Sequence, residues 1–192
     1  MVVVNERELL ADCLRRLNGA GVRYMLTGSM ASNYWGMPRT THDIDFVIQL
    51  PPSQAGMLAT AFSGDYYLDE QAIRAAYQPP YQFNAIDTRS ALKIDFWLLR
   101  PDPFEREMFS RRLEALLFGE KAWISTAEDV ILHKLYWNNI TPSDRQLGDA
   151  AGIVAVQGDR LDRSYLQSQA KQLRVEANLG RLLAGKIKPK TT

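Results

Sequence analysis

The first third of the chain alternates between helical and strand-like spacing of its apolar residues. Within residues 6–19 (ERELLADCLRRLNG) apolar side chains recur every three or four positions, which predicts an amphipathic helix. Short apolar runs predict buried strands at residues 22–28 (VRYMLTG) and 43–50 (DIDFVIQL). Helices are expected after each of these strands, at residues 29–36 and 53–63.

The rest of the chain is first mixed and then helical. The pattern predicts a helix at residues 68–77, two strands joined by the turn-forming residues 87–90, a further helix at 104–112, and a second hairpin that turns at Gly119. From residue 126 onward only helical spacing is found. We expect helices there at 126–139, 143–157, 163–173 and 175–185.

These elements predict the fold class α/β (α+β), with a mixed sheet flanked by helices and a helical C-terminal part. A chain of 192 residues with 46% hydrophobic content can form one domain or two small ones. We place a core domain at residues 1–124 and a helical region at residues 125–192.

Composition and charge exclude several classes of protein. The chain contains no apolar run long enough to span a membrane, and its opening stretch (MVVVNERELL) is too short and too soon charged for a signal peptide. We therefore expect a cytoplasmic protein with no membrane partner. The single Cys13 excludes an internal disulfide and a cysteine-based metal site. A net charge of +1 argues against a globally basic nucleic-acid-binding protein, although residues 171–190 are rich in lysine and arginine. That tail is either a solvated terminus or a phosphate contact.

Asp43 and Asp45 indicate a metal site. Residues two apart on a strand face the same way, so their carboxylates lie together and repel each other unless a cation stands between them. Oxygen ligands without a histidine or cysteine cluster suit Mg²⁺ or Mn²⁺. Asp95, in the stretch KIDFW, repeats the pattern. If its strand pairs beside the first, three carboxylates converge, as a two-metal phosphoryl-transfer site requires.

Gly28 and Ser29 indicate a phosphate-binding corner between a strand and a helix. Ser29 is a favoured N-cap residue, and the free N–H groups and positive dipole of a helix start attract phosphate. Glycine allows the close approach of a phosphate group. Taken alone, the pair is more often an ordinary turn and cap. Together with the three aspartates it favours a two-metal phosphoryl-transfer site over a solvated strand edge.

At this point the chain resembles the nucleotidyltransferase superfamily with the polymerase-beta-like fold. Gly28, Ser29, Asp43, Asp45 and Asp95 match the signature, and the stretch GMPRTTHDID is similar to the version found in the AbiEii-like branch, which includes toxins of toxin–antitoxin pairs. The resemblance implies a Mg²⁺- or Mn²⁺-dependent enzyme of the 2.7.7 class. Such an enzyme transfers a nucleoside monophosphate from an NTP to an acceptor hydroxyl and releases pyrophosphate. It also implies that the third carboxylate helps to activate the acceptor hydroxyl.

Three further residues complete the predicted nucleotide site. The resemblance implies that Lys134 contacts the nucleotide phosphates and that Asp149 is the aspartate that follows it. Arg39 either pairs with a carboxylate and holds the loop before the strand, or reaches a phosphate. For Lys134 a solvated position on an amphipathic helix is an equal alternative, and for Asp149 a surface position.

Two rival functions and several acceptors stay open at the level of the sequence. A non-catalytic nucleotide-binding or protein-interaction module would keep the same pocket, and a glycosyltransferase also uses an Asp-x-Asp metal site. The acceptor is a transfer RNA or other RNA, a protein hydroxyl or a small antibiotic, and an antitoxin is a candidate partner. The sequence determines neither the NTP that is used nor the oligomeric state.

Overall fold

The computed structural model describes residues 5–190, so residues 1–4 of the opening stretch and residues 191 and 192 lie outside the described part. The chain divides into two compact units, which are described separately. The first contains the residues up to Leu26 together with His42–Ile124. The second contains Thr27–Thr41 together with the residues from Ser125 onward. The segment Thr27–Thr41 therefore groups with the C-terminal helices.

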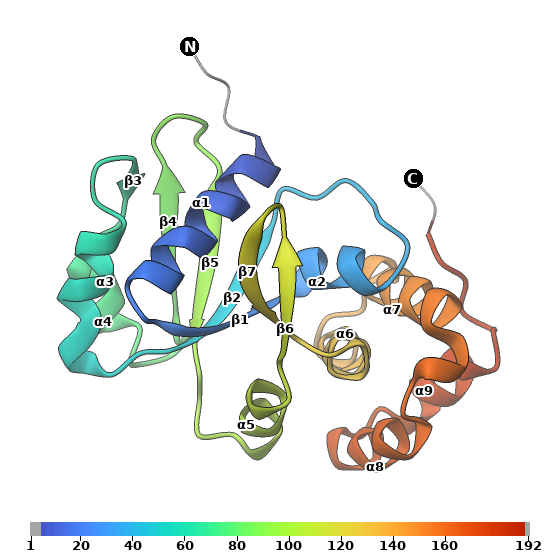
Figure 1. The fold of residues 1–192 in the computed structure, drawn as a ribbon. Coiled ribbons are helices and arrows are strands. Elements are labelled where there is room, and N and C mark those ends of the chain that lie inside the picture. The colour runs from blue at the N-terminus through green and yellow to red at the C-terminus, as the bar shows by residue number, and fades with distance from the viewer. Residues whose placement is uncertain (1–4, 191–192) are drawn as a thin grey trace. The chain divides into compact units, whose positions relative to one another are not determined.

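The first unit is built on a mixed β-sheet (Figure 1). Over the described residues the strand order is β3-β4-β5-β2-β1-β7-β6. β2 pairs with β5, and β1 with β7, in parallel, whereas β3–β4, β4–β5 and β6–β7 are antiparallel. The strands are β1 (Arg23–Thr27), β2 (Ile44–Gln49), β3 (Tyr66–Tyr67), β4 (Gln82–Asp87), β5 (Lys93–Leu98), β6 (Leu113–Leu117) and β7 (Glu120–Ile124).

Helix α1 and three shorter helices accompany this sheet. α1 begins with a capping box in which Asn5 and Glu8 satisfy each other's backbone N–H groups. Its apolar stripe from Leu9 to Leu17 is buried, as the helical spacing predicts. The helices of this unit are α1 (Glu6–Gly19), α3 (Ala55–Ala61), preceded by the 3₁₀ turn η1 (Pro52–Gln54), α4 (Glu70–Ala75) and α5 (Pro103–Ser110).

One face of the sheet carries the aromatic core. Phe46 of β2 stacks on Phe96 of β5 with ring centroids 5.8 Å apart, and Phe83 of β4 stacks on Phe96 at 5.3 Å. Ile44 and Ile48, on either side of Phe46 along β2, are fully buried as well. The alternation in DIDFVIQL therefore places its isoleucines and phenylalanine in the core, as predicted.

The opposite face is partly covered by α5. Met25 and Val47 form a second apolar cluster there with Met108 and Phe109 of α5, and Trp97 packs against it. Val47 and Trp97 are register partners on β2 and β5. The residues two positions earlier on these strands, 45 and 95, lie on this same face.

The second unit is helical. α6 begins at the N-cap Thr126, whose hydroxyl accepts a hydrogen bond from the backbone N–H of Asp129. α2 packs against α6 and α7, and α8 against α6 and α9. The helices are α2 (Gly28–Trp35), α6 (Ala127–Ile140), α7 (Asp144–Gln157), followed by the 3₁₀ turn η2 (Gly158–Arg160), α8 (Arg163–Leu173) and α9 (Glu176–Leu183).

The end of α2 passes very close to the backbone of α7. A Cβ atom on Gly36 would lie 2.8 Å from the backbone nitrogen of Ile153, so no larger side chain fits there without movement. Gly152 on α7 meets the backbone of Met37 in the same way, with 3.3 Å from its ideal Cβ position to the Met37 nitrogen. Because neither glycine has a side chain, the segment that carries Arg39 can lie close against α7.

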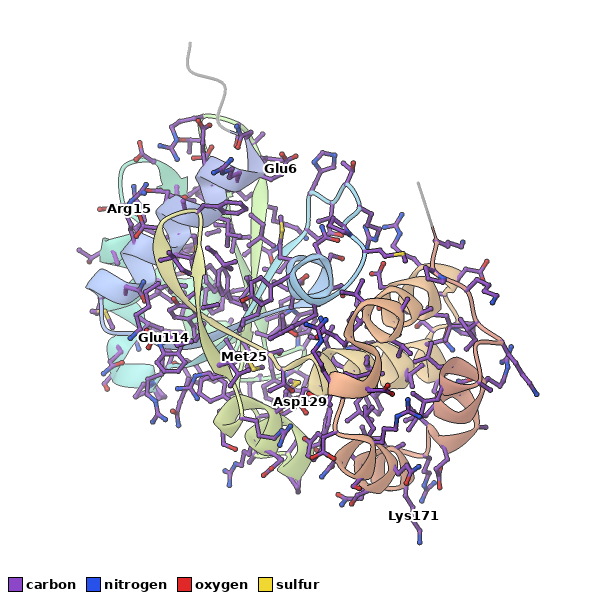
Figure 2. The ribbon with its side chains drawn as sticks, turned by 45° about the vertical axis from the view of Figure 1, so that its right-hand side comes forward. Glu6, Arg15, Met25, Glu114, Asp129 and Lys171 are labelled. Carbon is purple, nitrogen blue, oxygen red and sulfur yellow. The ribbon has the colours of Figure 1, made fainter. Side chains whose placement is uncertain are left out.

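The last described residue of the basic tail, Lys190, packs against α7. The Lys190 ammonium lies 3.4 Å from Asp144 Oδ2, and its side-chain carbons lie beside Gly148. Lys171, at the end of α8, is exposed and points away from the ribbon (Figure 2). Among residues 5–190 no helix combines the length and the apolar content that a membrane crossing requires.

The structure confirms the predicted fold class and the succession of helices and strands, with corrections at three places. Ser29 is not the N-cap of α2, because the helix already begins at Gly28 and Thr27 holds the cap position without a side-chain capping bond. β2 begins at Ile44, so Asp43 lies one residue before the strand. The two-residue strand β3 was not predicted.

Candidate active site: an acidic cluster and an ion-pair cluster

The first set of predicted site residues is the acidic cluster, which we define as Asp43, Asp45 and Asp95. Asp45 of β2 and Asp95 of β5 are register partners in adjacent parallel strands, so both side chains leave the sheet on the same face. Asp95 is nearly buried, Asp45 is half-buried and Asp43 is exposed. The strand pairing on which the site prediction depends is therefore present.

Each carboxylate oxygen of Asp95 is in contact with one neighbouring polar side chain. The Lys93 ammonium lies 2.9 Å from Asp95 Oδ2 and reaches it from the same strand, two residues away. Asn84 is the register partner of Asp95 on the antiparallel strand β4. In the orientation that satisfies both ends of its amide, Asn84 Nδ2 donates to Asp95 Oδ1 at 2.6 Å. Asp95 is thus held from both sides.

Lys93 also experiences the other two carboxylates of the acidic cluster. Its hydrogen bond with Asp95 raises the pKa of Lys93, partial burial opposes this, and the negative charges of Asp95, Asp43 and Asp45 raise the pKa further. The net result is a pKa above the ordinary value for lysine. An ammonium group therefore stands where the electrostatic field of three aspartates favours a cation.

The acidic cluster has the donor chemistry for a hard divalent cation, since carboxylate oxygens are the ligands that Mg²⁺ and Mn²⁺ prefer. In this conformation, however, no three His, Cys, Asp or Glu side chains within residues 5–190 are gathered closely enough to hold a metal ion. One of the three carboxylates, Asp95, already has a cation beside it in Lys93.

The second set lies in the helical unit, where Gly28 and Ser29 begin α2. Gly28 has φ = +63°, in the left-handed region that favours glycine, at the point where the chain leaves β1 and enters the helix. Its carbonyl accepts a hydrogen bond from the Ser32 hydroxyl at 3.0 Å. The Ser29 hydroxyl is buried and accepts a hydrogen bond from Arg39 Nη2 at 2.9 Å. Ser29 therefore anchors Arg39 instead of capping the helix.

Arg39, Lys134 and Asp149 form an ion-pair cluster. Arg39 binds Asp149 with two parallel bonds, from Nε to Oδ1 at 2.7 Å and from Nη2 to Oδ2 at 2.9 Å. Lys134 Nζ donates to Asp149 Oδ2 at 2.8 Å, and the side chains of both Lys134 and Asp149 are only 7% exposed. The sequence left Arg39 open between a carboxylate and a phosphate, and in this structure it binds the carboxylate. Neither Lys134 nor Asp149 takes the surface position that was the alternative.

The charge state of Asp149 follows from these contacts. Burial raises the pKa of Asp149, but the hydrogen bond from Arg39 together with the charge and hydrogen bond of Lys134 outweigh it, so the net pKa lies below the ordinary value. Asp149 is therefore a carboxylate near neutral pH. It pairs with Lys134, for which the resemblance implies phosphate contact, and with Arg39, for which a carboxylate was one of the two predicted partners.

Lys93 and Asn84 are the residues that the prediction missed. The alternation in KIDFW places Lys93 on the same strand face as Asp95, and this signal was available in the sequence. Asn84 gave no such signal, because its position beside Asp95 depends on the register of β4 and β5, which a single chain does not display.

No protein-family model and no curated protein matches the sequence. Among solved structures, ANT(2'')-Ia in complex with adenylyl-2''-tobramycin is 13% identical with a TM-score of 0.60, and the match covers 91% of this chain and 99% of that one. An antigenic nucleotidyltransferase-like protein from Paracoccidioides brasiliensis is 14% identical with a TM-score of 0.57, covering 97% of this chain and 94% of that one. JHP933 from Helicobacter pylori is 18% identical with a TM-score of 0.51, covering 94% and 76%.

At these low identities the likeness shows the fold, and it extends over nearly the whole chain. The mixed sheet of the first unit and the helices of the second are both included in the match. The chain therefore has the fold of the nucleotidyltransferase-like proteins.

Proposed function

We propose that this chain is a divalent-metal-dependent nucleotidyltransferase that transfers a nucleoside monophosphate from an NTP to an acceptor hydroxyl. One observation carries the proposal: the in-register pairing of Asp45 with Asp95 on a fold shared with nucleotidyltransferase-like proteins. In the reaction the acceptor oxygen forms a bond to the α-phosphorus. The bond from that phosphorus to the β-phosphate bridging oxygen breaks, and pyrophosphate leaves.

The acidic cluster provides the metal ligands and the base in this proposal. Asp43, Asp45 and Asp95 would hold Mg²⁺ or Mn²⁺, which when bound neutralises phosphate charge and lowers the pKa of a coordinated hydroxyl. Asp95 takes the acceptor proton, because it is the carboxylate that the neighbouring strand holds in place through Asn84. Asp43 and Asp45 would act on the triphosphate through the metal ion that they hold, since carboxylates alone repel phosphate.

The ion-pair cluster and the start of α2 bind the nucleotide in this proposal. The backbone N–H groups at Gly28 and Ser29 contact phosphate oxygens, as free helix-start N–H groups do. Arg39 holds this helix start through Ser29. Asp149 orients Lys134, which contacts a phosphate only when it shares its ammonium between Asp149 and the nucleotide.

The acceptor is the second part of the proposal. ANT(2'')-Ia, according to the complex that was solved, carries an adenylylated antibiotic, so a small hydroxyl compound is one acceptor class for this fold. The basic residues from Lys171 onward favour an RNA acceptor, for which a transfer RNA end is our first choice. The AbiEii-like motif adds the proposal that the chain is a toxin with an antitoxin partner.

The test is transfer of label from each of the four α-labelled NTPs in the presence of Mg²⁺ and either total RNA or an aminoglycoside mixture. We expect labelled product and pyrophosphate release. Asp45→Asn and Asp95→Asn should each lower transfer by on the order of 10³-fold or more, because either change removes a metal ligand. Circular dichroism should show that both variants stay folded.

Glu114→Gln is the matched control for these substitutions. Glu114 is a carboxylate on the outer strand β6 (Figure 2), is half-exposed and has no proposed role. Its substitution should leave transfer unchanged. Nucleotide protection against melting without pyrophosphate release from any acceptor would instead indicate a non-catalytic binding module, and activity in Asp45→Asn would contradict the proposed metal site.

A further inference from the structure

Lys93 combines an exposed side chain with a close contact to a carboxylate that is itself nearly buried. Its side chain is 49% exposed, whereas the side chain of its partner Asp95 is 13% exposed. The Asp95 carboxylate is fixed by Asn84, while the Lys93 ammonium is free to swing into solvent on its four-carbon stem. The lysine, and not the aspartate, is the member of this pair that can leave.

The Lys93 ammonium places a positive charge beside Asp95, as a divalent cation bound to this carboxylate would. The ammonium lies 2.9 Å from Asp95 Oδ2, whereas Asn84 donates its hydrogen bond to the other oxygen, Oδ1. The charges of Asp43 and Asp45 also act on this ammonium. A metal ion that uses Asp95 as a ligand would bring a second cation to the carboxylate that already binds Lys93, and the two positive charges repel each other.

From this geometry we infer that Lys93 is an internal counterion that competes with the divalent metal for the acidic cluster. Without metal, the ammonium of Lys93 neutralises Asp95. When metal binds, Lys93 moves away from Asp95 Oδ2 and keeps its proton, so one cation replaces another. The inference rests on the proposed function, since it concerns regulation of the same metal site.

Competition of this kind makes metal binding weaker in the free protein. Part of the metal's binding energy is used to break the ion pair and to approach a retained positive charge. An NTP brings additional phosphate ligands for the metal and an alternative anionic partner for the lysine. Lys93 therefore favours the binding of metal together with nucleotide over the binding of metal alone.

The experiment measures Mn²⁺ binding by electron paramagnetic resonance of the free ion, at low salt and without nucleotide. Lys93→Met should bind Mn²⁺ about 3- to 10-fold more tightly than the wild type, from the loss of the ion pair and of the nearby charge. Lys93→Arg, which keeps a cation beside Asp95, should stay within about 2-fold of the wild type.

Lys121→Met is the matched control. Lys121 lies on β7 of the same sheet, is 52% exposed and pairs with Glu114 on β6 at 2.6 Å, so its substitution removes the same charge away from the acidic cluster. Its Mn²⁺ affinity should equal that of the wild type. An equal gain in Lys93→Met and Lys121→Met would reduce the effect to net charge and overturn the inference.

The remaining outcomes separate this inference from the proposed function. If Asp45→Asn abolishes Mn²⁺ binding but Lys93→Met leaves it unchanged or weakens it, the metal site stands and the competition is refuted. If neither the wild type nor Lys93→Met binds Mn²⁺, with or without an NTP, both the metal site and the competition fail.

Discussion

At the scale of single residues, the orientation of the Asp95 side chain depends on two neighbouring residues. Its two carboxylate oxygens face a neutral amide, Asn84, and a cation, Lys93. Neither partner belongs to the residue signature that suggested the site. Hydrogen-bonding partners of this kind fix the orientation of a ligand side chain, and their loss often reduces metal affinity or activity.

Asn84→Ala tests this role. With Asp95 no longer held from β4, Mn²⁺ affinity and the rate of transfer should each fall on the order of 10-fold. The free energy of unfolding in urea should change little, because Asn84 is exposed. Gln82→Ala, two residues earlier on the same face of β4, is the control and should leave affinity and rate unchanged. A similar loss in both variants would mean that β4 itself was disturbed.

Asp149 connects the two cations of the ion-pair cluster. Asp149→Asn removes the carboxylate that binds Arg39 through two bonds and Lys134 through one. Removing one member of a buried ion pair costs on the order of 3–5 kcal/mol, so we expect a loss of that size in urea unfolding near neutral pH. Asp159→Asn, at a fully exposed carboxylate on the same unit, should have no measurable effect.

The pH dependence of this loss has a definite sign. The folded-state pKa of Asp149 lies below its ordinary value of 3.8, so its contribution is present above that pH and is lost as the pH falls through the lower folded value. The stability difference between the wild type and Asp149→Asn should therefore shrink in acid. A difference independent of pH would contradict the assigned ion pairs.

At the scale of elements, the segment after α2 lies so close to α7 that any side chain larger than that of Gly36 should lower stability. Gly36→Ala places a Cβ 2.8 Å from the backbone of Ile153, which cannot rotate away. We expect a loss of about 1–3 kcal/mol in urea unfolding, the usual cost of overpacking, and weaker nucleotide binding because Arg39 shifts with the segment.

Gly180→Ala provides the opposite case within the same unit. Gly180 lies inside α9, and an added Cβ would meet no atom within 4 Å. Alanine in a helix interior is favoured over glycine by about 0.5–1 kcal/mol, so this variant should be slightly more stable. Equal effects of the two substitutions would contradict the contact assigned to Gly36.

The sequence predicted elements well where one periodicity dominated and failed where tertiary contacts decided. The alternation in DIDFVIQL identified β2 and its buried face, and the spacing of Leu9 to Leu17 identified α1. The capping preference of Ser29 was overridden, because Gly28 adopts a positive φ and starts the helix earlier. β3 is held by pairing with β4, and its two residues carry no local pattern.

For the candidate site, the sequence predicted the aspartates but not the side chains that contact them. The aspartates were identified from spacing, and the β2–β5 pairing brings Asp45 and Asp95 into register as the site requires. The partners Lys93 and Asn84, and the fact that Asp149 binds both Arg39 and Lys134, depend on long-range packing. A single sequence contains no direct record of such contacts.

At the scale of the whole molecule, the proposed function predicts that the complete chain binds nucleotide together with metal. A ligand at about 100 times its Kd adds roughly 2.7 kcal/mol of stability, which corresponds to a rise in Tm of about 5–10 °C for a chain of this size. Melting with Mg²⁺ and an NTP should show this rise, and Asp45→Asn should abolish it. A shift with nucleotide sugars but not with NTPs would instead favour a glycosyltransferase.

The most direct test of the central claim is the anomalous diffraction of manganese in crystals grown with Mn²⁺ and a non-hydrolysable NTP analogue. The account predicts an anomalous peak within coordination distance of the carboxylates of Asp45 and Asp95, with the Lys93 ammonium displaced from Asp95. A bound analogue with no manganese at these two aspartates, or manganese only at other carboxylates, would contradict it.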